Sequence, residues 1–240
     1  MANRRKRRAR YKKTITHPSA PWWEEYSWLF LIGTGLLVIV GFIVWKEMRL
    51  PLTSTPADAA FMERSRPFEI SYGDGDAPVT IIEYASLTCG SCKHFHTEAV
   101  KPLEPSYIRG GQVRYVFRHY PLNAPALDGA LLLSCLPSER AKPVIDTLFA
   151  NQDIWAVAED PRHHLRNYFT AAGMSGAAIE NCLNNEEQKE ALVTEQQKAR
   201  ETLNISSTPT VFINGRLYKG QKRFKAMRRV IDVLLKKSEG

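Results

Sequence analysis

The chain has 240 residues, enough for one sizeable domain with an appendage. Its 44% hydrophobic and 10% aromatic residues exclude an intrinsically disordered protein. The net charge of +8 would suit nucleic-acid binding, but eight cations near the N-terminus account for all of it: Arg4, Arg5, Lys6, Arg7, Arg8, Arg10, Lys12 and Lys13. Removing them from the 33 Lys and Arg leaves 25, which equals the 25 Asp and Glu. The body is therefore neutral, and we expect no nucleic-acid partner.

An uncharged stretch follows the basic tail of residues 1–25. Residues 26–45, "YSWLFLIGTGLLVIVGFIVW", would span about 30 Å as a helix, which is the thickness of a bilayer's hydrocarbon core. Trp28 near one end and Trp45 at the other suit the two membrane interfaces. We predict a transmembrane anchor rather than a cleaved signal peptide, whose apolar region is usually shorter. The positive tail predicts that the N-terminus lies in the cytoplasm and that the C-terminal body lies on the far side of the membrane.

Residues 46–66 are predicted to be a linker, because residues 51–66 are rich in Pro, Ser and Thr. From residue 67 to residue 240 the order of elements predicts one α/β domain. β-branched and aromatic residues predict strands at 68–70, 79–86 and 112–120, and a hairpin around Asn214-Gly215. Apolar residues at helical spacing predict helices at 91–107 and 222–237, and a helical insertion at about 124–200.

Two cysteines lie where the 79–86 strand gives way to a helix, in the stretch "SLTCGSCKHFH". Backbone N–H groups at a helix start favour a thiolate over a thiol. We therefore assign Cys89 as the attacking thiolate and Cys92 as the more buried resolving thiol. Such a pair would exchange disulfides with another protein.

A metal site is the alternative, because Cys89, Cys92, His94 and His96 are all competent zinc ligands. On a helix, however, His94 lies about 200° around from Cys92, so the four side chains do not converge. We expect no metal site, and we expect both histidines on the helix surface or in a cleft. A histidine close to the thiolate, His94 above all, would tune its pKa.

Thr208-Pro209 precedes a predicted strand, a placement that suits a cis-proline packed against the active-site sulfurs. Together with the Cys-x-x-Cys at a helix start and the helical insertion, it resembles the DsbA-type thiol–disulfide oxidoreductases of the thioredoxin superfamily. The resemblance implies the thioredoxin-like fold with a helical insertion for residues 67–240. It is closest to membrane-anchored or exported bacterial members, which implies a single-pass inner-membrane protein with its catalytic domain in the periplasm. The Thr208-Pro209 loop would then hold an extended substrate beside Cys89. The resemblance also implies that Glu83 is a buried acid that moves protons to and from Cys92. The alternative for Glu83 is an ordinary surface acid.

The sequence departs from the well-known oxidants of this family between the two cysteines. They carry Pro-His there, whereas this chain has Gly90-Ser91, which supplies no charge. We expect Ser91 to donate a hydrogen bond to the Cys89 thiolate instead. We expect an oxidising couple, but not an extreme one.

Cys135 and Cys182 both lie in the predicted helical block. In an oxidising compartment we expect a structural disulfide between them, worth about 4 kcal/mol if unfolded-chain entropy sets its effect. The alternatives are two buried free thiols, or an exposed bridge that modulates the first pair.

We predict an enzyme, a protein disulfide oxidase that needs no bound cofactor because the Cys89–Cys92 disulfide is itself the redox group. Its predicted partners are exported proteins with free thiols, the membrane and, by resemblance, a quinone-linked DsbB-like protein. A reductase or isomerase on the same fold and a Cys/His metal-delivery module remain the alternatives. The basic residues of 222–237 most simply form a solvated helix face, with contact to a membrane surface left open.

Overall fold

The structure is a computed structural model that describes residues 32–42, 50–53, 56–58, 61–62, 66 and 68–238. It divides into two units, Met1–Leu50 and Pro51–Gly240. In the first unit, residues 32–42 are helical and carry exposed apolar side chains such as Leu37 and Val38. Within the part of the chain that is described, no helix reaches the length and apolarity that crossing a membrane requires. The basic tail and the rest of the predicted anchor, 26–31 and 43–45, lie outside the described residues.

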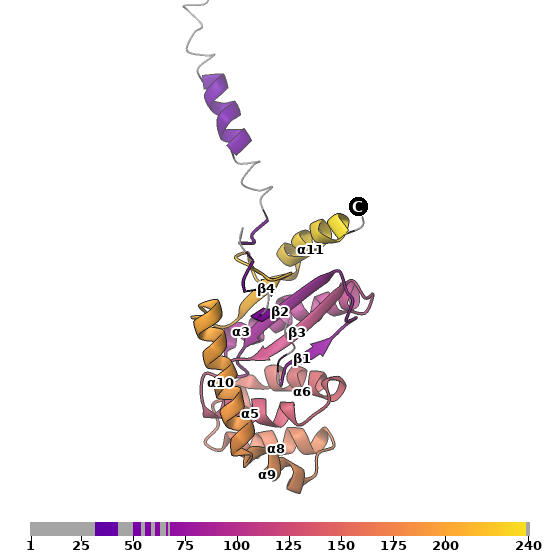
Figure 1. The fold of residues 1–240 in the computed structure, drawn as a ribbon, viewed down its shortest axis with the longest axis vertical. Helices are drawn as coiled ribbons and strands as arrows, with labels where there is room; N and C mark the ends of the chain where they lie inside the picture. Colours follow the sequence, from indigo (N-terminus) through magenta and orange to yellow (C-terminus); the bar gives the residue numbers. More distant parts are fainter. Residues whose placement is uncertain are drawn as a thin grey trace, which may run out of the picture. The chain divides into compact units, whose positions relative to one another are not determined.

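A five-stranded sheet forms the centre of the second unit (Figure 1). In spatial order its strands are β1 (Ile70–Tyr72), β3 (Val113–His119), β2 (Val79–Ala85), β4 (Thr210–Ile213) and β5 (Arg216–Leu217). β2 and β3 run parallel, and the other neighbouring pairs are antiparallel. Each predicted strand is present, although β1 begins two residues later than expected. Asn214 and Gly215 have φ values of 45° and 71°, as a two-residue hairpin turn requires.

The crossover from β2 to β3 is one helical run directly after the two cysteines. It consists of α3 (Gly90–Phe95), η1 (His96–Val100), α4 (Lys101–Leu103) and η2 (Glu104–Ile108). Pro102 and Pro105 lack the N–H that an α-helix uses. The run continues past both with wider π-helical turns, such as the bond from Arg109 N to Glu104 O at 3.0 Å. The prolines therefore do not end the helix, which runs on to Ile108.

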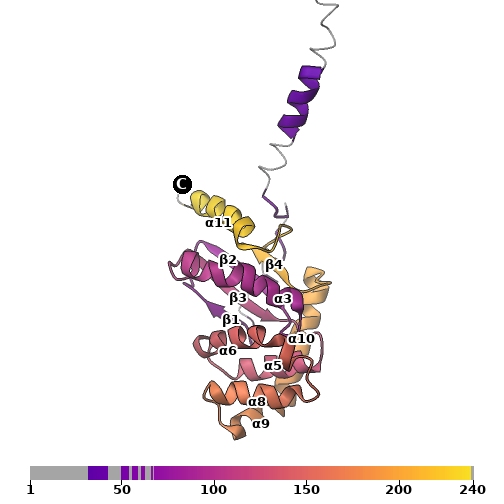
Figure 2. The ribbon, with the colours of Figure 1, turned by 180° about the vertical axis from the view of Figure 1, so that it is seen from behind.

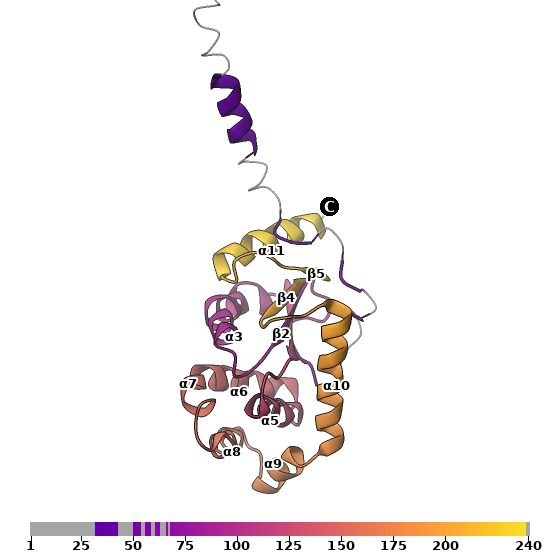
Figure 3. The same ribbon diagram turned by 90° about the vertical axis from the view of Figure 1, so that its left-hand side faces the viewer.

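Different helices cover the two faces of the sheet. Figure 3 shows α3 and the long α10 (Glu186–Leu203) on opposite sides of the strands. The final helix, α11 (Phe224–Ser238), packs beside α3's continuation and buries Met227, Val230 and Ile231. Because side chains alternate along a strand, Ile82 and Tyr84 point toward α10 and Glu83 points toward the α3 face.

The predicted helical insertion is a block at one end of the sheet (Figures 1 and 2). It contains α5 (Ala124–Ser134), α6 (Ser138–Ala150), α7 (Gln152–Trp155), α8 (Pro161–Ala171) and α9 (Gly176–Leu183), and α10 returns the chain to the sheet. Several helices begin at a polar side chain that accepts a backbone N–H bond, as Asn123 does from Ala126. The thioredoxin-like fold with a helical insertion is confirmed.

The described residues of the predicted linker are bonded to the domain. Lys219 N donates to Pro51 O at 2.7 Å, and Leu52 pairs with Tyr218 beyond the end of β5. Further along, Met62 is only 4% exposed and its carbonyl accepts from Arg118 at 3.0 Å. The Pro, Ser and Thr content suggested a tether, but the apolar side chains among these residues cover the sheet face and bind them to the domain.

Candidate active site

Cys89 is the residue that caps the N-terminus of α3, with extended backbone angles. Its side chain is half-buried, and its Sγ lies 3.4 Å from the carbonyl oxygen of Thr208. A hydrogen bond from the Cys92 side chain lowers the pKa of Cys89 to about 5, helped by Thr208 and by the N–H groups of Cys92 and Ser91, while burial opposes the shift. Cys89 is therefore a thiolate at neutral pH.

Cys92 has the opposite environment. It is 0% exposed, and burial raises the pKa of its thiol far above the ordinary value. Its hydrogen bond to Cys89 and the negative charge of Glu83 add to that rise. This asymmetry is what an attacking Cys89 and a resolving Cys92 would need.

The loop before β4 lies directly against Cys89. The Thr208-Pro209 peptide bond is cis, as the sequence suggested. Thr208 Oγ1 is buried and makes no hydrogen bond of ordinary geometry within the described residues, yet its proximity still lowers the pKa of Cys89.

Glu83 is fully buried on β2, so it is not a surface acid. Burial raises its pKa to about 8 despite a hydrogen bond from the Tyr115 hydroxyl, and the charge of Cys89 raises it further. The other carboxyl oxygen, Oε1, is buried without a hydrogen-bond partner among the described residues. Glu83 therefore holds a proton at neutral pH, and it lies close enough to Cys92 to raise the pKa of that thiol.

The structure does not give Ser91 and His94 the contacts that the sequence suggested. Ser91 is exposed, and its backbone N–H rather than its hydroxyl stabilises the Cys89 thiolate. His94 is also exposed, and no hydrogen bond in the described part of the chain joins it to Cys89 or Cys92. Its angular distance from Cys92 around the helix is the reason.

His96 is buried, in contrast to the expectation that it lies at the surface or in a cleft. Its Nε2 lies 2.7 Å from Asp146 Oδ1, and its ring packs on Phe149 with centroids 4.9 Å apart. Among the described residues, no group of three or more His, Cys, Asp or Glu side chains is placed to hold a metal ion.

Gln152 is a site residue that the sequence did not reveal. From α7 its buried amide donates to Leu87 O at 2.7 Å and to Cys89 O at 3.1 Å. The neighbouring Asp153 forms an ion pair with Lys93 of α3. The helical block thus holds the active-site turn through contacts 60 or more residues apart in sequence, which no local pattern predicts.

A groove of about 470 Å³ adjoins the Thr208-Pro209 loop. Residues 120–122 form one wall, residues 204–206 another, and Gln196 and Arg200 of α10 a third. Leu122 is 55% exposed beside Asn123, whose side chain bonds to Thr88 next to the reactive cysteine. The groove thus begins where an extended chain lying along the loop would continue.

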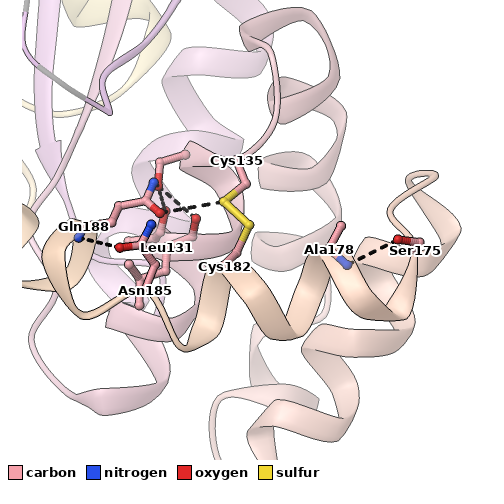
Figure 4. Close-up of a disulfide and its surroundings, with 9 residues drawn as sticks. Leu131, Cys135, Ser175, Ala178, Cys182, Asn185 and Gln188 are labelled. Carbon is pink, nitrogen blue, oxygen red and sulfur yellow. Dashed lines mark hydrogen bonds between the residues drawn. A yellow bond between two sulfur atoms is a disulfide. The ribbon is translucent and has the colours of Figure 1, made fainter.

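Cys135 and Cys182 form a disulfide, with an S–S distance of 2.07 Å and Cα atoms 6.6 Å apart. The bridge joins Cys135, the residue directly after α5, to Cys182 in α9 (Figure 4). The expected pairing is therefore present, and the alternative of two free thiols is not.

Comparison with known proteins points to one family. A family model described as thioredoxin matches residues 65–233. The crystal structure of Wolbachia pipientis alpha-DsbA1 aligns with a TM-score of 0.68 and 29% identity, covering 73% of this chain and 95% of that one. BdbD from Bacillus subtilis aligns with a TM-score of 0.65 at 19% identity, covering 78% of this chain and 100% of that one, which supports the fold alone.

Similar sequences carry related names. A Rickettsia bellii protein provisionally named a protein-disulfide oxidoreductase is 25% identical over 144 residues, 60% of this chain and 56% of that protein. Disulfide bond formation protein D of Bacillus subtilis is 22% identical over 174 residues, 68% of this chain and 76% of that protein. The chain thus spans little more than half the length of the Rickettsia relative.

Proposed function

Because the chain belongs to the thioredoxin family and, within it, to the DsbA-type thiol–disulfide oxidoreductases, we propose that it introduces disulfide bonds into exported proteins through Cys89 and Cys92. The observation that carries this proposal is the position of Cys89. Its half-buried sulfur has a lowered pKa and faces the Thr208 carbonyl, while Cys92 behind it is fully buried.

The reaction begins with the Cys89–Cys92 disulfide. A substrate thiolate attacks Cys89 Sγ, which forms a mixed disulfide and breaks the bond to Cys92. Cys92 leaves as a thiolate and takes the proton of Glu83, whose pKa of about 8 keeps it protonated at neutral pH. The second substrate thiolate then attacks its own chain's sulfur in the mixed disulfide. Cys89 is released as a thiolate, and two electrons have passed from the substrate to the enzyme.

The direction of transfer follows from the thiolate. Stabilising ionised Cys89 stabilises the reduced enzyme, so the disulfide becomes the better oxidant. The Cys92 side chain, the Thr208 loop and the helix start supply that stabilisation here, since Gly90-Ser91 brings no charged side chain.

A redox titration of the purified chain against glutathione tests the proposal. A reduction potential closer to about −120 mV than to about −270 mV supports a disulfide-forming role. A value near the latter would favour the alternative role of a disulfide reductase.

Substrate binding follows from the loop and its groove. An extended segment pairing with the backbone at Thr208 would place its cysteine beside Cys89 and its flanking residues in the groove lined by Leu122. Reoxidation requires an electron acceptor, by resemblance a quinone-linked DsbB-like membrane protein.

The same proposal includes a single inner-membrane anchor at residues 26–45, with the domain in the periplasm. Its support is the uncharged stretch, the basic tail before it and the exposed apolar side chains of residues 32–42. Carbonate extraction and protease digestion of spheroplasts test it. The proposal requires that the protein stay in the membrane pellet and that the domain be digested from outside.

A further inference from the structure

The last part of the domain is strongly cationic. Between residues 219 and 237 the only acid is Asp232, and the eight cations are Lys219, Lys222, Arg223, Lys225, Arg228, Arg229, Lys236 and Lys237. The rest of the chain beyond residue 13 has 17 Lys and Arg against 24 Asp and Glu. The chain beyond residue 13 is therefore neutral as a whole, but residues 219–237 are cationic and the rest is acidic.

These cations also differ from the others in their pairing. Arg228 lies 3.5 Å from Asp232, and the other seven form no ion pair within the described residues. Elsewhere in the domain ten cations have a carboxylate partner: Arg66, Lys93, Arg109, Arg114, Arg118, Lys142, Arg162, Arg166, Lys189 and Lys198. Unlike those ten, the seven cations lie within ion-pair distance of no carboxylate among the described residues, although the charge of Lys222 acts on Glu83.

α11 presents part of this charge on one face. Lys225, Arg229 and Lys236 are exposed at helical spacing, and Met227 and Val230 are buried on the other side. Figure 3 shows α11 as an outer layer beyond β4 and β5, with its outward side uncovered by other elements of the domain. We call the exposed side of α11 the cationic face. It carries Lys225, Arg228, Arg229 and Lys236, Asp232 lies among them paired with Arg228, and the exposed Lys237 adjoins it at the end of the helix.

The chain enters the domain beside the start of this segment. Pro51 O accepts a hydrogen bond from Lys219 N at 2.7 Å, and Thr53 N donates to Leu217 O at 3.0 Å. The predicted anchor ends at Trp45, and six residues reach at most about 20 Å. Covalent geometry alone therefore keeps Lys219 close to the surface of any membrane that holds the anchor.

We propose that the cationic face of α11 binds anionic phospholipid headgroups of the membrane that holds the anchor. This inference rests on the anchor of the proposed function. Each Lys or Arg near an anionic surface strengthens binding about fivefold, and the short connection makes the membrane permanently available. An acidic protein is the alternative partner, but it would have to compete with a membrane surface to which the chain is already tethered. Binding through α11 would fix which side of the catalytic domain faces the membrane.

Lysine labelling of the full chain tests this contact. The protein is reconstituted into phosphatidylcholine vesicles or into an equal mixture with phosphatidylglycerol, and a membrane-impermeant acetylating reagent is followed by mass spectrometry. We expect Lys225, Lys236 and Lys237 to react about fivefold more slowly in the anionic vesicles, and about 1 M NaCl to abolish the difference. Lys189 and Lys198 on α10 are the internal controls.

A matched pair of variants separates this face from charge in general. Lys225→Glu/Lys236→Glu should remove the protection of Lys237, whereas Lys189→Glu/Lys198→Glu should leave it intact. Equal labelling of α11 in both vesicle types would overturn the proposal, and so would protection that neutral vesicles give equally.

Flotation of the same samples tests the anchor separately. A chain that floats with neutral vesicles but shows no protection of α11 keeps its anchor and refutes the α11 contact. A chain that floats only with anionic vesicles and protects α11 supports the contact and refutes the anchor. A chain that floats with neither refutes both.

Discussion

The two cysteine pairs lie in one domain but in contrasting surroundings. Cys89 and Cys92 share one helical turn, where a cap position and full burial drive their pKa values in opposite directions. Cys135 and Cys182 are 47 residues apart and join two helices of the insertion. A disulfide between Cys89 and Cys92 is therefore suited to exchange with a substrate, whereas the disulfide between Cys135 and Cys182 is suited to cross-linking two helices. The surroundings of the sulfurs, rather than the cysteines themselves, make that difference.

The largest contrast is expected when each pair is removed in turn. Cys89→Ser should lower the oxidation rate of a reduced model substrate at least about 10³-fold, because the attacked sulfur is gone. Cys92→Ser cannot form the Cys89–Cys92 disulfide and should also lose turnover with reduced substrate. Its Cys89 thiolate should instead attack the disulfide of an oxidised model substrate, release one substrate thiolate and retain the other sulfur as a mixed disulfide, visible as a covalent complex on a non-reducing gel. Retained turnover in Cys89→Ser would end the assignment.

Removing the second pair should affect stability rather than chemistry. Cys135→Ala/Cys182→Ala should lower the free energy of unfolding by about 4 kcal/mol, less if the unfolded chain retains structure. Urea unfolding measures the loss. The pKa of Cys89, followed by thiolate absorbance, should stay at about 5, and a clear shift would mean that the second bridge modulates the first.

Glu83→Gln tests the proton that Cys92 receives. Gln keeps a partner for Tyr115 but cannot give a proton, so release of Cys92 should slow about 10²-fold at neutral pH. The inflection near pH 8 in the pH–rate profile should also disappear. Tyr115→Phe serves as the control, since it removes the hydrogen bond and keeps the acid.

The same carboxyl links pH to stability. Because its pKa rises from 4.5 to about 8 on folding, the folded state binds the proton more tightly than the unfolded state does. The stability that it contributes is complete below about pH 4.5 and is lost as pH rises through about 8. Glu83→Gln should lack this loss in denaturation curves measured across that range, and an unchanged pH dependence would contradict the buried-acid assignment.

The smallest expected effect comes from the contact between Gln152 of the helical insertion and the turn that carries Cys89. Gln152→Leu leaves the buried carbonyls of Leu87 and Cys89 without a donor, which should cost about 2 kcal/mol of stability. It should also raise the pKa of Cys89 above about 5, because the cap loses its support. Gln196→Leu removes a similar bond, to Pro121 O at 2.9 Å, and should leave that pKa unchanged. Equal pKa values in the two variants would reduce Gln152 to a structural role.

The sequence predicted the features that depend on local pattern. A Cys-x-x-Cys at a strand–helix junction, the Asn214-Gly215 turn and the order of strands and helices all have short-range signals, and the structure contains them. Gln152 and the burial of His96 have no such signal, because both depend on the packing of the insertion against α3. The bonds that join residues 51–53, 57 and 62 to the domain were not predicted for a related reason. The Pro, Ser and Thr content of the segment suggests a flexible linker. Its backbone hydrogen bonds to the hairpin, which is far away in sequence, hold it in place instead.

Leu52 lies along one edge of the sheet, and this position bears on the proposed reaction with extended protein substrates. An open sheet edge would accept an extended client as an additional strand, at a place where no chemistry follows. Here the outer strand β5 has two residues, and Leu52 and Thr53 bond to residues 217 and 218 alongside it. The entering chain thus covers the β5 edge of the sheet, so an extended substrate of the proposed function would not pair with β5 there.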